Sequence, residues 1–271
     1  MVYAYPKISR CGLGNMLLPW ARAEIFCHEY NARMLKPQFV HRPSLGAILR
    51  RERYARLYNG NFDFSHSGYI SGLKRHLLLL TRMKIDEFEL RKLRDGAVVV
   101  FEGLRGEFSQ ILKSHQLVVD RLMAITHPKI LADIRKLKDG GPYIGVHIRR
   151  GDFKLAGVMT DDEWYVRAIA KAIEIAGDRL PIRIFSDGHP CQLEFVRNAF
   201  PKSDVVIMPD AKPLHDIWAL SQSAVMVGSS RSSFSIWAVL LGQMPSIWAR
   251  QNALPTESLY KDGNSTHIIM D

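Results

Sequence analysis

Short apolar strands alternate with amphipathic helices through the second half of this 271-residue chain. The pattern predicts strands at 143–148, 182–186, 204–208, 224–228 and 245–249, and helices at 161–176, 192–199, 214–223 and 233–241. Strands that alternate with helices are joined by right-handed crossovers and form a parallel, doubly wound sheet. Ligands of such sheets bind beyond the carboxyl ends of the strands, so polar residues that directly follow a strand are the first candidates for a site.

The first half carries a weaker version of the same pattern. It predicts strands at 2–8 and 97–103 and helices at 16–31 and 109–124. Between them, residues 36–95 form a basic, mostly helical insertion that is rich in loops. The stretch "KLKDGGP" (136–142) interrupts the apolar pattern with charge, two glycines and a proline, so we place a boundary there. The sequence therefore predicts an α/β protein with two Rossmann-like lobes, 1–138 and 139–271, and a cleft between them.

The net charge of +10 is unevenly distributed. Segment 36–95 holds 13 Lys and Arg against 6 Asp and Glu. The simpler interpretation is a solvated basic face. The alternative is a surface that binds anionic lipid headgroups or a phosphate-bearing acceptor. It is supported by apolar residues that alternate with arginines 50, 51, 53 and 56. These apolar residues are Leu45, Ile48, Leu49, Leu57 and Tyr58. We expect no nucleic-acid partner, because no helix-turn-helix, zinc-finger or aromatic-basic signature accompanies the charge.

The cysteines and the apolar runs bear on the cell compartment. The three cysteines, Cys11, Cys27 and Cys191, form no C-x-x-C pair, and we expect each to be a small buried hydrophobe in a reducing compartment. The longest aliphatic block, 77–80, is far shorter than the ~18 residues of a membrane-spanning helix. We therefore expect a cytoplasmic protein that touches the inner membrane face peripherally.

The motif "GVHIRRGDF" (145–153) places His147, Arg149, Arg150 and Asp152 at the end of a predicted strand. A salt-bridged turn is the simpler interpretation of any one of these residues. Two consecutive arginines point in different directions, so one can face a ligand while the other braces the loop through Asp152. An arginine fork suits a pair of phosphate oxygens.

The motif "GSSRSSFSIWA" (228–238) sets Ser232, Ser233 and Phe234 at a predicted helix start. Free backbone N–H groups, hydroxyls and the positive end of the helix dipole together make an anion site there. A plain serine N-cap is the alternative for Ser232 or Ser233 taken alone. Combined with the arginines after strand 143–148, the serines favour a phosphate site.

Two further strand ends carry candidate residues. Asp187, in "FSDGHP", is either a turn residue or a carboxylate that accepts two hydrogen bonds from the guanine edge. Gly12, Gly14 and Asn15, in "CGLGN", form either an ordinary tight turn or a loop that lets a ligand approach the backbone closely. Neither motif is specific by itself.

The sequence favours neither metal nor serine-nucleophile chemistry. It contains no D-x-D, no H-x-x-x-H and no carboxylate triad with ligand spacing, so we expect no metal site. It also lacks the G-x-S-x-G elbow of a nucleophilic serine. Arginine and helix-terminus charge are the groups left to neutralise a bound anion.

Taken in order, "GLGNMLLPWARAEIF", "GVHIRRGDF", "FSDGHP" and "DIWALSQSAVMVGSSRSSFSIWAVLLG" resemble the bacterial alpha-1,2-fucosyltransferases and the wider group with the alpha-1,6- and protein O-fucosyltransferases. The resemblance is strongest over 141–242. It implies a GT-B-like fold with an acceptor-side lobe 1–138 and a nucleotide-sugar lobe 139–271. It also implies an inverting, metal-independent transfer of fucose from GDP-fucose to a glycan hydroxyl, with a surface polysaccharide precursor as the expected acceptor.

The resemblance also implies roles for the site residues. Arg149 contacts the diphosphate, His147 and Arg150 lie at the nucleotide, and Asp187 contacts guanine. The phosphate pocket is lined by Ser232, Ser233 and Phe234, while Gly12, Gly14 and Asn15 close the site from the first lobe. Asp152 and Glu107 are the candidates for the general base.

Departures from the family pattern leave the acceptor and the linkage open. The chain has "GNMLLPWA" where relatives usually have "GNQLFQYA", and "SSFSIWA" where they usually have "SSFSWWG". Met16 thereby replaces an amide that could contact donor or acceptor. Two alternative functions are also kept: a transferase for another nucleotide sugar, and a catalytically silent nucleotide- or glycan-binding protein, because a fold does not guarantee activity.

Overall fold

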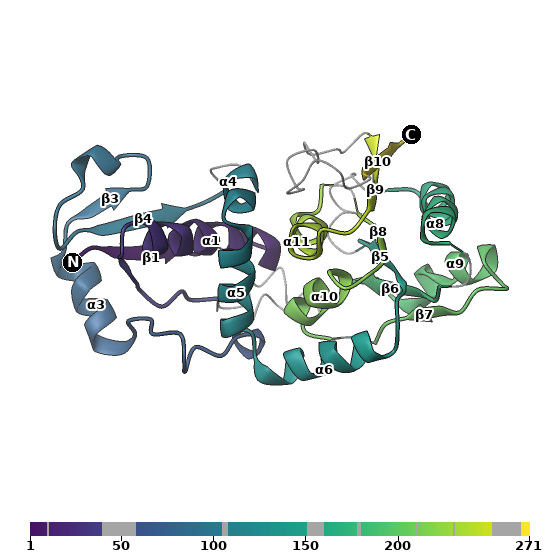
Figure 1. The fold of residues 1–271 in the computed structure, drawn as a ribbon, viewed down its shortest axis with the longest axis horizontal. Helices are drawn as coiled ribbons and strands as arrows, with labels where there is room; N and C mark the ends of the chain where they lie inside the picture. Colours follow the sequence, from purple (N-terminus) through teal and green to yellow (C-terminus); the bar gives the residue numbers. More distant parts are fainter. Residues whose placement is uncertain are drawn as a thin grey trace. The chain divides into compact units, whose positions relative to one another are not determined.

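The computed structural model divides the chain into two compact units, unit 1 (Met1–Pro128) and unit 2 (Lys129–Asp271). The structure describes residues 1–9, 11–39, 58–104, 108–150, 160–177, 180–209, 211–229, 231–250 and 267–271. Each unit is built on its own parallel sheet with helices against it (Figure 1). These parallel sheets agree with the predicted α/β class.

Unit 1 contains a four-stranded parallel sheet of order β2-β1-β4-β3. The strands are β1 (Tyr3–Lys7), β2 (Arg33–Met34), β3 (Lys84–Asp86) and β4 (Val98–Glu102). The helices are α1 (Leu13–Glu29), α3 (Gly72–Thr81), α4 (Phe108–Lys113) and α5 (His115–Ile125), with short 3₁₀ turns at Asn59–Asn61 and Leu90–Lys92. Helix α1 lies along β1 and β4 and buries most of its side chains (Figure 1).

A buried ion pair joins α1 to the β3–β4 connection in unit 1. The Arg22 guanidinium donates to both carboxylate oxygens of Glu87, at 2.7 and 3.0 Å, and both side chains are 6% exposed. Arg22 also donates to the carbonyls of Glu102 and Gly103 at the end of β4. A paired, bidentate arginine is the form in which a charge is tolerated inside a protein, so this contact fixes α1 against the strand ends.

Unit 2 contains a six-stranded parallel sheet of order β10-β9-β8-β5-β6-β7. The strands are β5 (Ile144–Ile148), β6 (Ile182–Ser186), β7 (Val205–Ile207), β8 (Val225–Val227), β9 (Ser246–Ala249) and β10 (His267–Met270). The helices are α6 (Pro128–Asp139), α8 (Asp162–Ala176), α9 (Glu194–Ala199), α10 (Pro213–Leu220) and α11 (Ser233–Gly242), with a 3₁₀ turn at Pro190–Gln192.

Helices cover both faces of the unit 2 sheet. Figure 1 shows α8 and α9 on one side and α10 and α11 on the other. Strand β5 lies in the middle of the sheet and is buried throughout, which explains its continuous apolar sequence. Asp161 caps α8 by accepting a hydrogen bond from the Trp164 backbone N–H, at 2.5 Å. This sheet confirms the predicted parallel, doubly wound architecture.

The structure refines several sequence predictions. The helix predicted at 109–124 is two helices, α4 and α5, and α6, β2, β3 and β10 were not predicted. The chain divides after Pro128, so α6 belongs to unit 2, whereas the predicted boundary lies at 138. Within segment 36–95, β3 is an edge strand of the unit 1 sheet, so this segment contributes more than an inserted set of helices.

The expectation that every cysteine is buried was wrong. Cys191 is exposed, and Cys11 and Cys27 are only partly buried. Cys191 lies in the 3₁₀ turn after β6, where the chain runs along the surface of unit 2. Among the described helices, none has both the length and the apolarity to cross a bilayer.

Candidate active site

The carboxyl ends of β5 and β6 bring Arg149 and Asp187 together in unit 2. These strands are parallel neighbours, with Ile148 in register with Ser186, so the residue after each strand lies at the same edge of the sheet. The Nε atom of Arg149 lies 3.9 Å from Oδ2 of Asp187. The Arg149 side chain is 24% exposed and that of Asp187 is 45% exposed. A carboxylate has two oxygens with several lone pairs, so Asp187 retains capacity to accept bonds from a ligand.

Arg150 points away from the strand ends and into unit 2. Its guanidinium is 6% exposed and forms an ion pair with Asp162 at the start of α8. It also donates to the Thr160 carbonyl at 3.4 Å and lies over the rings of Tyr165 and Phe195. Asp152, the partner that the sequence suggested for Arg150, lies outside the described residues. The two consecutive arginines therefore do point in different directions, and Arg150 braces the start of α8.

The backbone at Arg150 is tied to the β6 end as well. The Arg150 N–H donates to Oδ1 of Asp187 at 2.7 Å. Gly188 follows, and a Cβ atom at this position would lie 2.8 Å from Cγ of Arg150. Gly188 is therefore needed because the Arg150 stem passes directly over its backbone.

His147 is enclosed between two residues of the α11 N-terminus. Its ring stacks on Phe234 at 4.9 Å between centroids, and its Nδ1 lies 2.7 Å from the Ser235 hydroxyl. His147 is 6% exposed. Burial, with a smaller effect from the positive charge of Arg149, lowers the pKa of His147 to about 3. The imidazole is therefore neutral at physiological pH and lies as an uncharged polar group at the end of β5.

The loop between β8 and α11 is held by a serine network. Ser232 is 2% exposed and caps α11, with its hydroxyl accepting from the Ser235 N–H at 3.4 Å. The Ser235 hydroxyl accepts from the Ser229 N–H at 3.1 Å, and the Ser229 hydroxyl lies 3.1 Å from that of Tyr165. Arg231 adopts a left-handed φ of 49°, a conformation that few non-glycine residues adopt.

These contacts qualify the predicted roles of the serines. The capping alternative accounts for the buried hydroxyl of Ser232, whereas Ser233 and Phe234 are only half-buried at the helix start. The first-turn N–H groups of α11 and its positive dipole end lie at the same sheet edge as Arg149. This edge of unit 2 therefore combines a guanidinium, a helix N-terminus and a carboxylate.

The glycine loop of unit 1 lies at the end of β1. Gly12 is the N-cap residue of α1, with an ordinary φ of −66°, and a Cβ atom added to it would meet nothing within 4 Å. Gly14 is buried in the first turn of α1. Asn15 lines a hollow of about 210 Å³ together with Ser9, Cys11, Pro19, Gly103 and Leu104. Neither conformation nor packing within unit 1 demands a glycine at position 12. A role of Gly12, Gly14 and Asn15 in donor binding stays a prediction.

Both candidates for the general base, Asp152 and Glu107, lie outside the described residues. Within the described part of the chain, no three His, Cys, Asp or Glu side chains gather in a way that could hold a metal ion.

Sequence reasoning missed the residues that hold the site in place. Ser235 stood inside the quoted serine motif but was not singled out, and Ser229 lies in the same loop. Asp162 lies at the start of the predicted helix 161–176 and was not considered as a partner of Arg150. Their roles depend on tertiary contacts, because Ser235 is 88 residues from His147 in the chain and Asp162 is 12 residues from Arg150.

A doubly wound parallel sheet with arginine, carboxylate and a helix N-terminus at its carboxyl edge defines a class of α/β proteins that bind phosphate-bearing ligands at that edge. Residues 88–267 match the family described as "Glycosyl transferase family 11". The chain therefore belongs to glycosyl transferase family 11, a family of fucosyltransferases.

Solved structures with a similar fold are also fucosyltransferases. NodZ alpha-1,6-fucosyltransferase co-crystallized with GDP is 18% identical, with 90% of this chain and 92% of that chain covered and a TM-score of 0.59. Fucosyltransferase NodZ from Bradyrhizobium is 17% identical, with 90% and 93% covered and a TM-score of 0.58. POFUT1 in complex with GDP is 11% identical, with 90% and 96% covered and a TM-score of 0.58. No curated protein sequence matches the chain. These likenesses confirm the predicted GT-B-like fold.

Proposed function

We propose that this protein transfers fucose from GDP-fucose to a hydroxyl group of a glycan. Membership of family 11 supports the reaction class. Similar folds are seen in NodZ soaked with GDP-fucose and in POFUT1 in complex with GDP-fucose. The observation that carries the proposal is the proximity of Arg149 and Asp187 at the carboxyl edge of the unit 2 sheet, where Nε of Arg149 lies 3.9 Å from Oδ2 of Asp187.

The proposed reaction is a single displacement with inversion at the anomeric carbon. The acceptor oxygen forms a bond to this carbon while the bond to the diphosphate oxygen breaks, and GDP leaves with the electron pair. The acceptor proton passes to a carboxylate, with Asp152 and Glu107 as the candidates. Negative charge develops on the leaving diphosphate, and Arg149 with the α11 N-terminus stabilises it without a metal ion.

The neutral imidazole of His147 fits this arrangement. A charged histidine next to Arg149 would add a second cation in a buried position, whereas the neutral ring, stacked on the half-buried Phe234, keeps one polar edge at the nucleotide. Asp187, 45% exposed at the end of β6, supplies the acceptor oxygens for the N1–H and N2–H groups of guanine.

We propose an alpha-1,2 linkage, because the motifs of this chain in their order resemble the bacterial alpha-1,2-fucosyltransferases, and a lipid-linked surface polysaccharide precursor as the acceptor. An acceptor of this kind is reached from the cytoplasmic face of the inner membrane. Product analysis by NMR distinguishes an alpha-1,2 from an alpha-1,6 linkage.

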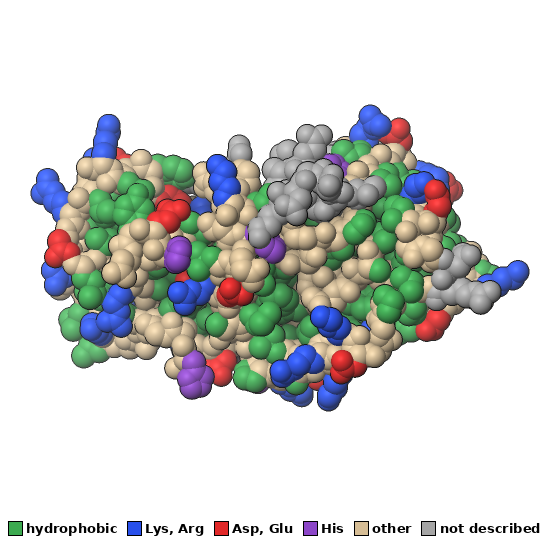
Figure 2. Space-filling model, viewed as in Figure 1, with side chains coloured by type: hydrophobic (Ala, Val, Ile, Leu, Met, Phe, Trp, Pro, Cys, Tyr) green, Lys and Arg blue, Asp and Glu red, His purple; other side chains and the backbone are tan. Residues whose placement is uncertain are grey.

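Helix α3 of unit 1 supports peripheral membrane contact. Three leucines, Leu73, Leu77 and Leu80, lie at helical spacing on one face and are 76%, 50% and 81% exposed. Figure 2 shows hydrophobic side chains at this end of unit 1 with Lys and Arg side chains beside them. The exposed basic residues of this region are Lys74, Arg82 and Lys84. An apolar stripe with basic neighbours suits an anionic membrane surface.

The other apolar residues expected to make this contact do not add to it. Tyr58 is 6% exposed and packs inside unit 1. Leu45, Ile48, Leu49 and Leu57 lie outside the described residues.

A donor panel tests the proposed function. The protein is incubated with GDP-fucose, GDP-mannose and UDP-galactose, with and without EDTA, and nucleotide binding, slow hydrolysis and transfer to glycans are measured. We expect GDP-fucose to be preferred and EDTA to have no effect. Preference for the UDP-sugar would contradict the proposed role of Asp187, and GDP binding without hydrolysis or transfer would favour a silent binding protein.

A variant pair sharpens this test. Asp187→Asn keeps the size of the side chain but replaces one acceptor oxygen by a donor, so we expect the preference for GDP over UDP to fall about tenfold or more. Asp204→Asn, a carboxamide substitution just before β7, is the matched control and should leave the preference unchanged.

A further inference from the structure

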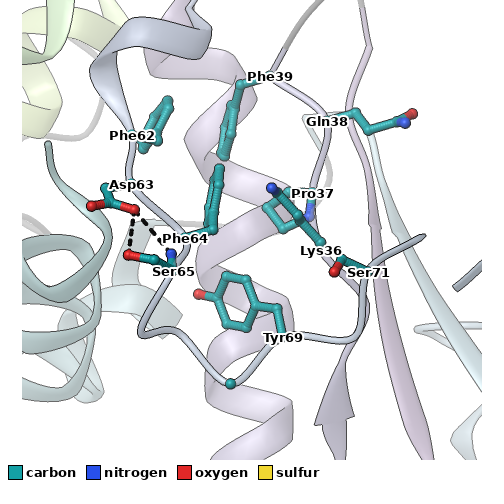
Figure 3. A pocket seen from close by; sticks show the side chains of 11 residues that line it. Lys36, Pro37, Gln38, Phe39, Phe62, Asp63, Phe64, Ser65, Tyr69 and Ser71 are labelled. Atoms are coloured by element: carbon teal, nitrogen blue, oxygen red, sulfur yellow. Dashed lines mark hydrogen bonds between the residues drawn. The ribbon is translucent and has the colours of Figure 1, made fainter. Parts of the chain in front are cut away.

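Unit 1 contains a hollow of about 870 Å³ with an aromatic wall. Figure 3 shows Phe62, Phe39 and Phe64 side by side, with Tyr69 next to them. The Phe39 and Phe62 rings stack at 4.1 Å, and Phe64 lies 5.7 Å from Phe62 and 5.8 Å from Tyr69. Phe39 and Phe62 are buried, while Phe64 and Tyr69 are half-buried at the surface of the hollow.

Polar groups surround this aromatic wall. Lys36 lies with its Nζ atom 4.9 Å from the centre of the Phe64 ring, and Asp63 lies on the other side of that ring in Figure 3. Oδ1 of Asp63 accepts hydrogen bonds from the Ser65 hydroxyl at 2.7 Å and from the Ser65 N–H at 2.9 Å. These bonds hold the pKa of Asp63 below its ordinary value, so the carboxylate is charged. Gln38 and Ser71 complete the polar rim.

A buried hydrogen-bond network holds the Tyr69 side chain in place. Its hydroxyl donates to the Glu24 carboxylate and accepts from Nε1 of Trp20 at 3.2 Å. Glu24 is 3% exposed, and Nε of Arg121 lies 3.7 Å from its second oxygen. A buried carboxylate is costly to keep inside a protein. Here it holds one wall of the hollow in a single orientation, which reduces the ordering cost of binding a ligand.

We propose that this hollow binds one neutral hexose residue of the acceptor glycan, a role that rests on the proposed function. A pyranose has an apolar face of C–H groups, which packs on aromatic side chains, and hydroxyls around its edge. Those hydroxyls donate to Asp63 and accept from Lys36 and Gln38. One carboxylate and one ammonium group cancel in charge, so an acidic sugar gains no net attraction in the hollow, while its own carboxylate loses hydration on binding. The volume exceeds that of one sugar ring, so the hollow also accommodates part of the next residue.

Direct sugar binding tests this proposal without any donor. The full-length protein is titrated with lactose, maltotriose and chitotriose, and with trigalacturonic acid as the acidic counterpart, and dissociation constants are measured by ligand-observed NMR. We expect at least one neutral sugar to bind and the acidic sugar to bind more weakly. Asp63→Asn and Phe64→Leu should each weaken neutral binding about tenfold, because each removes one class of contact.

Matched variants and a second ligand separate the outcomes. Asp120→Asn and Phe88→Leu change an exposed Asp and an exposed Phe of unit 1 outside the hollow, and should bind sugar as the unchanged protein does. Failure of all neutral sugars to bind, preference for the acidic sugar, or unchanged binding by folded Asp63→Asn and Phe64→Leu would overturn the proposal. GDP binding is measured in the same samples. If the unchanged protein binds a neutral sugar but not GDP, the result contradicts the proposed function and still supports a sugar site in the hollow.

Discussion

Nδ1 of His147 lies 2.7 Å from the hydroxyl of Ser235, in a contact that joins the centre of the unit 2 sheet to the first turn of α11. The same hydroxyl accepts from the Ser229 N–H, so Ser235 links the imidazole to the loop between β8 and α11. Ser235 and the stacked Phe234 ring together fix the position of His147.

Protonation of His147 should couple stability to pH. Its pKa of about 3 in the folded protein lies below the ordinary value of 6.5, so between these values the unfolded chain binds a proton that the folded chain does not. The free energy of unfolding therefore falls as the pH falls below 6.5, by about 1.4 kcal/mol per pH unit from this group. Urea denaturation at pH 7 and pH 5 measures the change.

His147→Asn isolates this effect, because asparagine keeps a polar atom near Nδ1 but does not titrate. Between pH 7 and pH 5, we expect the unchanged protein to lose about 2 kcal/mol more than the variant. Equal losses in the two proteins would show that His147 takes up a proton as readily when folded as when unfolded.

Substitution of Arg149 should lower activity, whereas substitution of Arg150 should lower stability. Arg149→Ala removes a partly exposed guanidinium from the strand end, so we expect turnover of GDP-fucose to fall about 10²- to 10³-fold with little change in melting temperature. Arg150→Ala removes a buried side chain that holds Asp162 and covers two rings, so we expect the free energy of unfolding to fall by about 2 kcal/mol. Calorimetry and initial rates on both variants distinguish them. The assignment fails if Arg149→Ala retains near-normal activity.

Gly188→Ala should destabilise unit 2 through a clash with Arg150. The new Cβ atom would lie 2.8 Å from Cγ of Arg150, so the arginine stem must move. We expect a loss of about 1–3 kcal/mol in urea denaturation. In an Arg150→Ala background the Cγ atom is gone, while Cβ of residue 150 at 3.0 Å and Oε1 of Gln192 at 3.1 Å remain, so the same glycine substitution should cost less but still destabilise unit 2. Additive losses in this double-mutant cycle would place the strain elsewhere.

The fold of unit 2 could be predicted largely from its sequence, because β5, β6 and β8 are short, mostly buried and apolar runs that alternate with helices along the chain. Edge strands were harder. Strands β2 and β3 have two and three residues, too few to show a pattern, and β10 has no helix pattern before it in the chain. Helix α6 was overlooked because its charged last turn was assigned to a linker.

Only the site residues that directly follow neighbouring parallel strands could be predicted from the sequence. Arg149 and Asp187 each follow a strand directly, and parallel neighbours bring such residues together. The inward turn of Arg150 toward Asp162 depends on where α8 begins relative to β5. The contact of His147 with Ser235 depends on how α11 packs on the sheet, and no local pattern encodes it.

Helix α3 yields a prediction for membrane binding. Arg75 of this helix is buried over the Tyr5 ring while Leu73 and Leu80 are exposed, the reverse of the usual arrangement in a water-facing helix. Each leucine inserted into a bilayer surface contributes about 1.5–3 kcal/mol. We expect a Leu73→Gln, Leu80→Gln double variant to bind vesicles that contain phosphatidylglycerol at least tenfold more weakly in a sedimentation assay. Met123→Gln, which changes an exposed apolar residue of α5, is the matched control. Binding should also weaken as the salt concentration is raised, because Lys74 and its basic neighbours contribute by charge. Salt-independent binding, or equal binding by the double variant and the unchanged protein, would contradict a membrane role for α3.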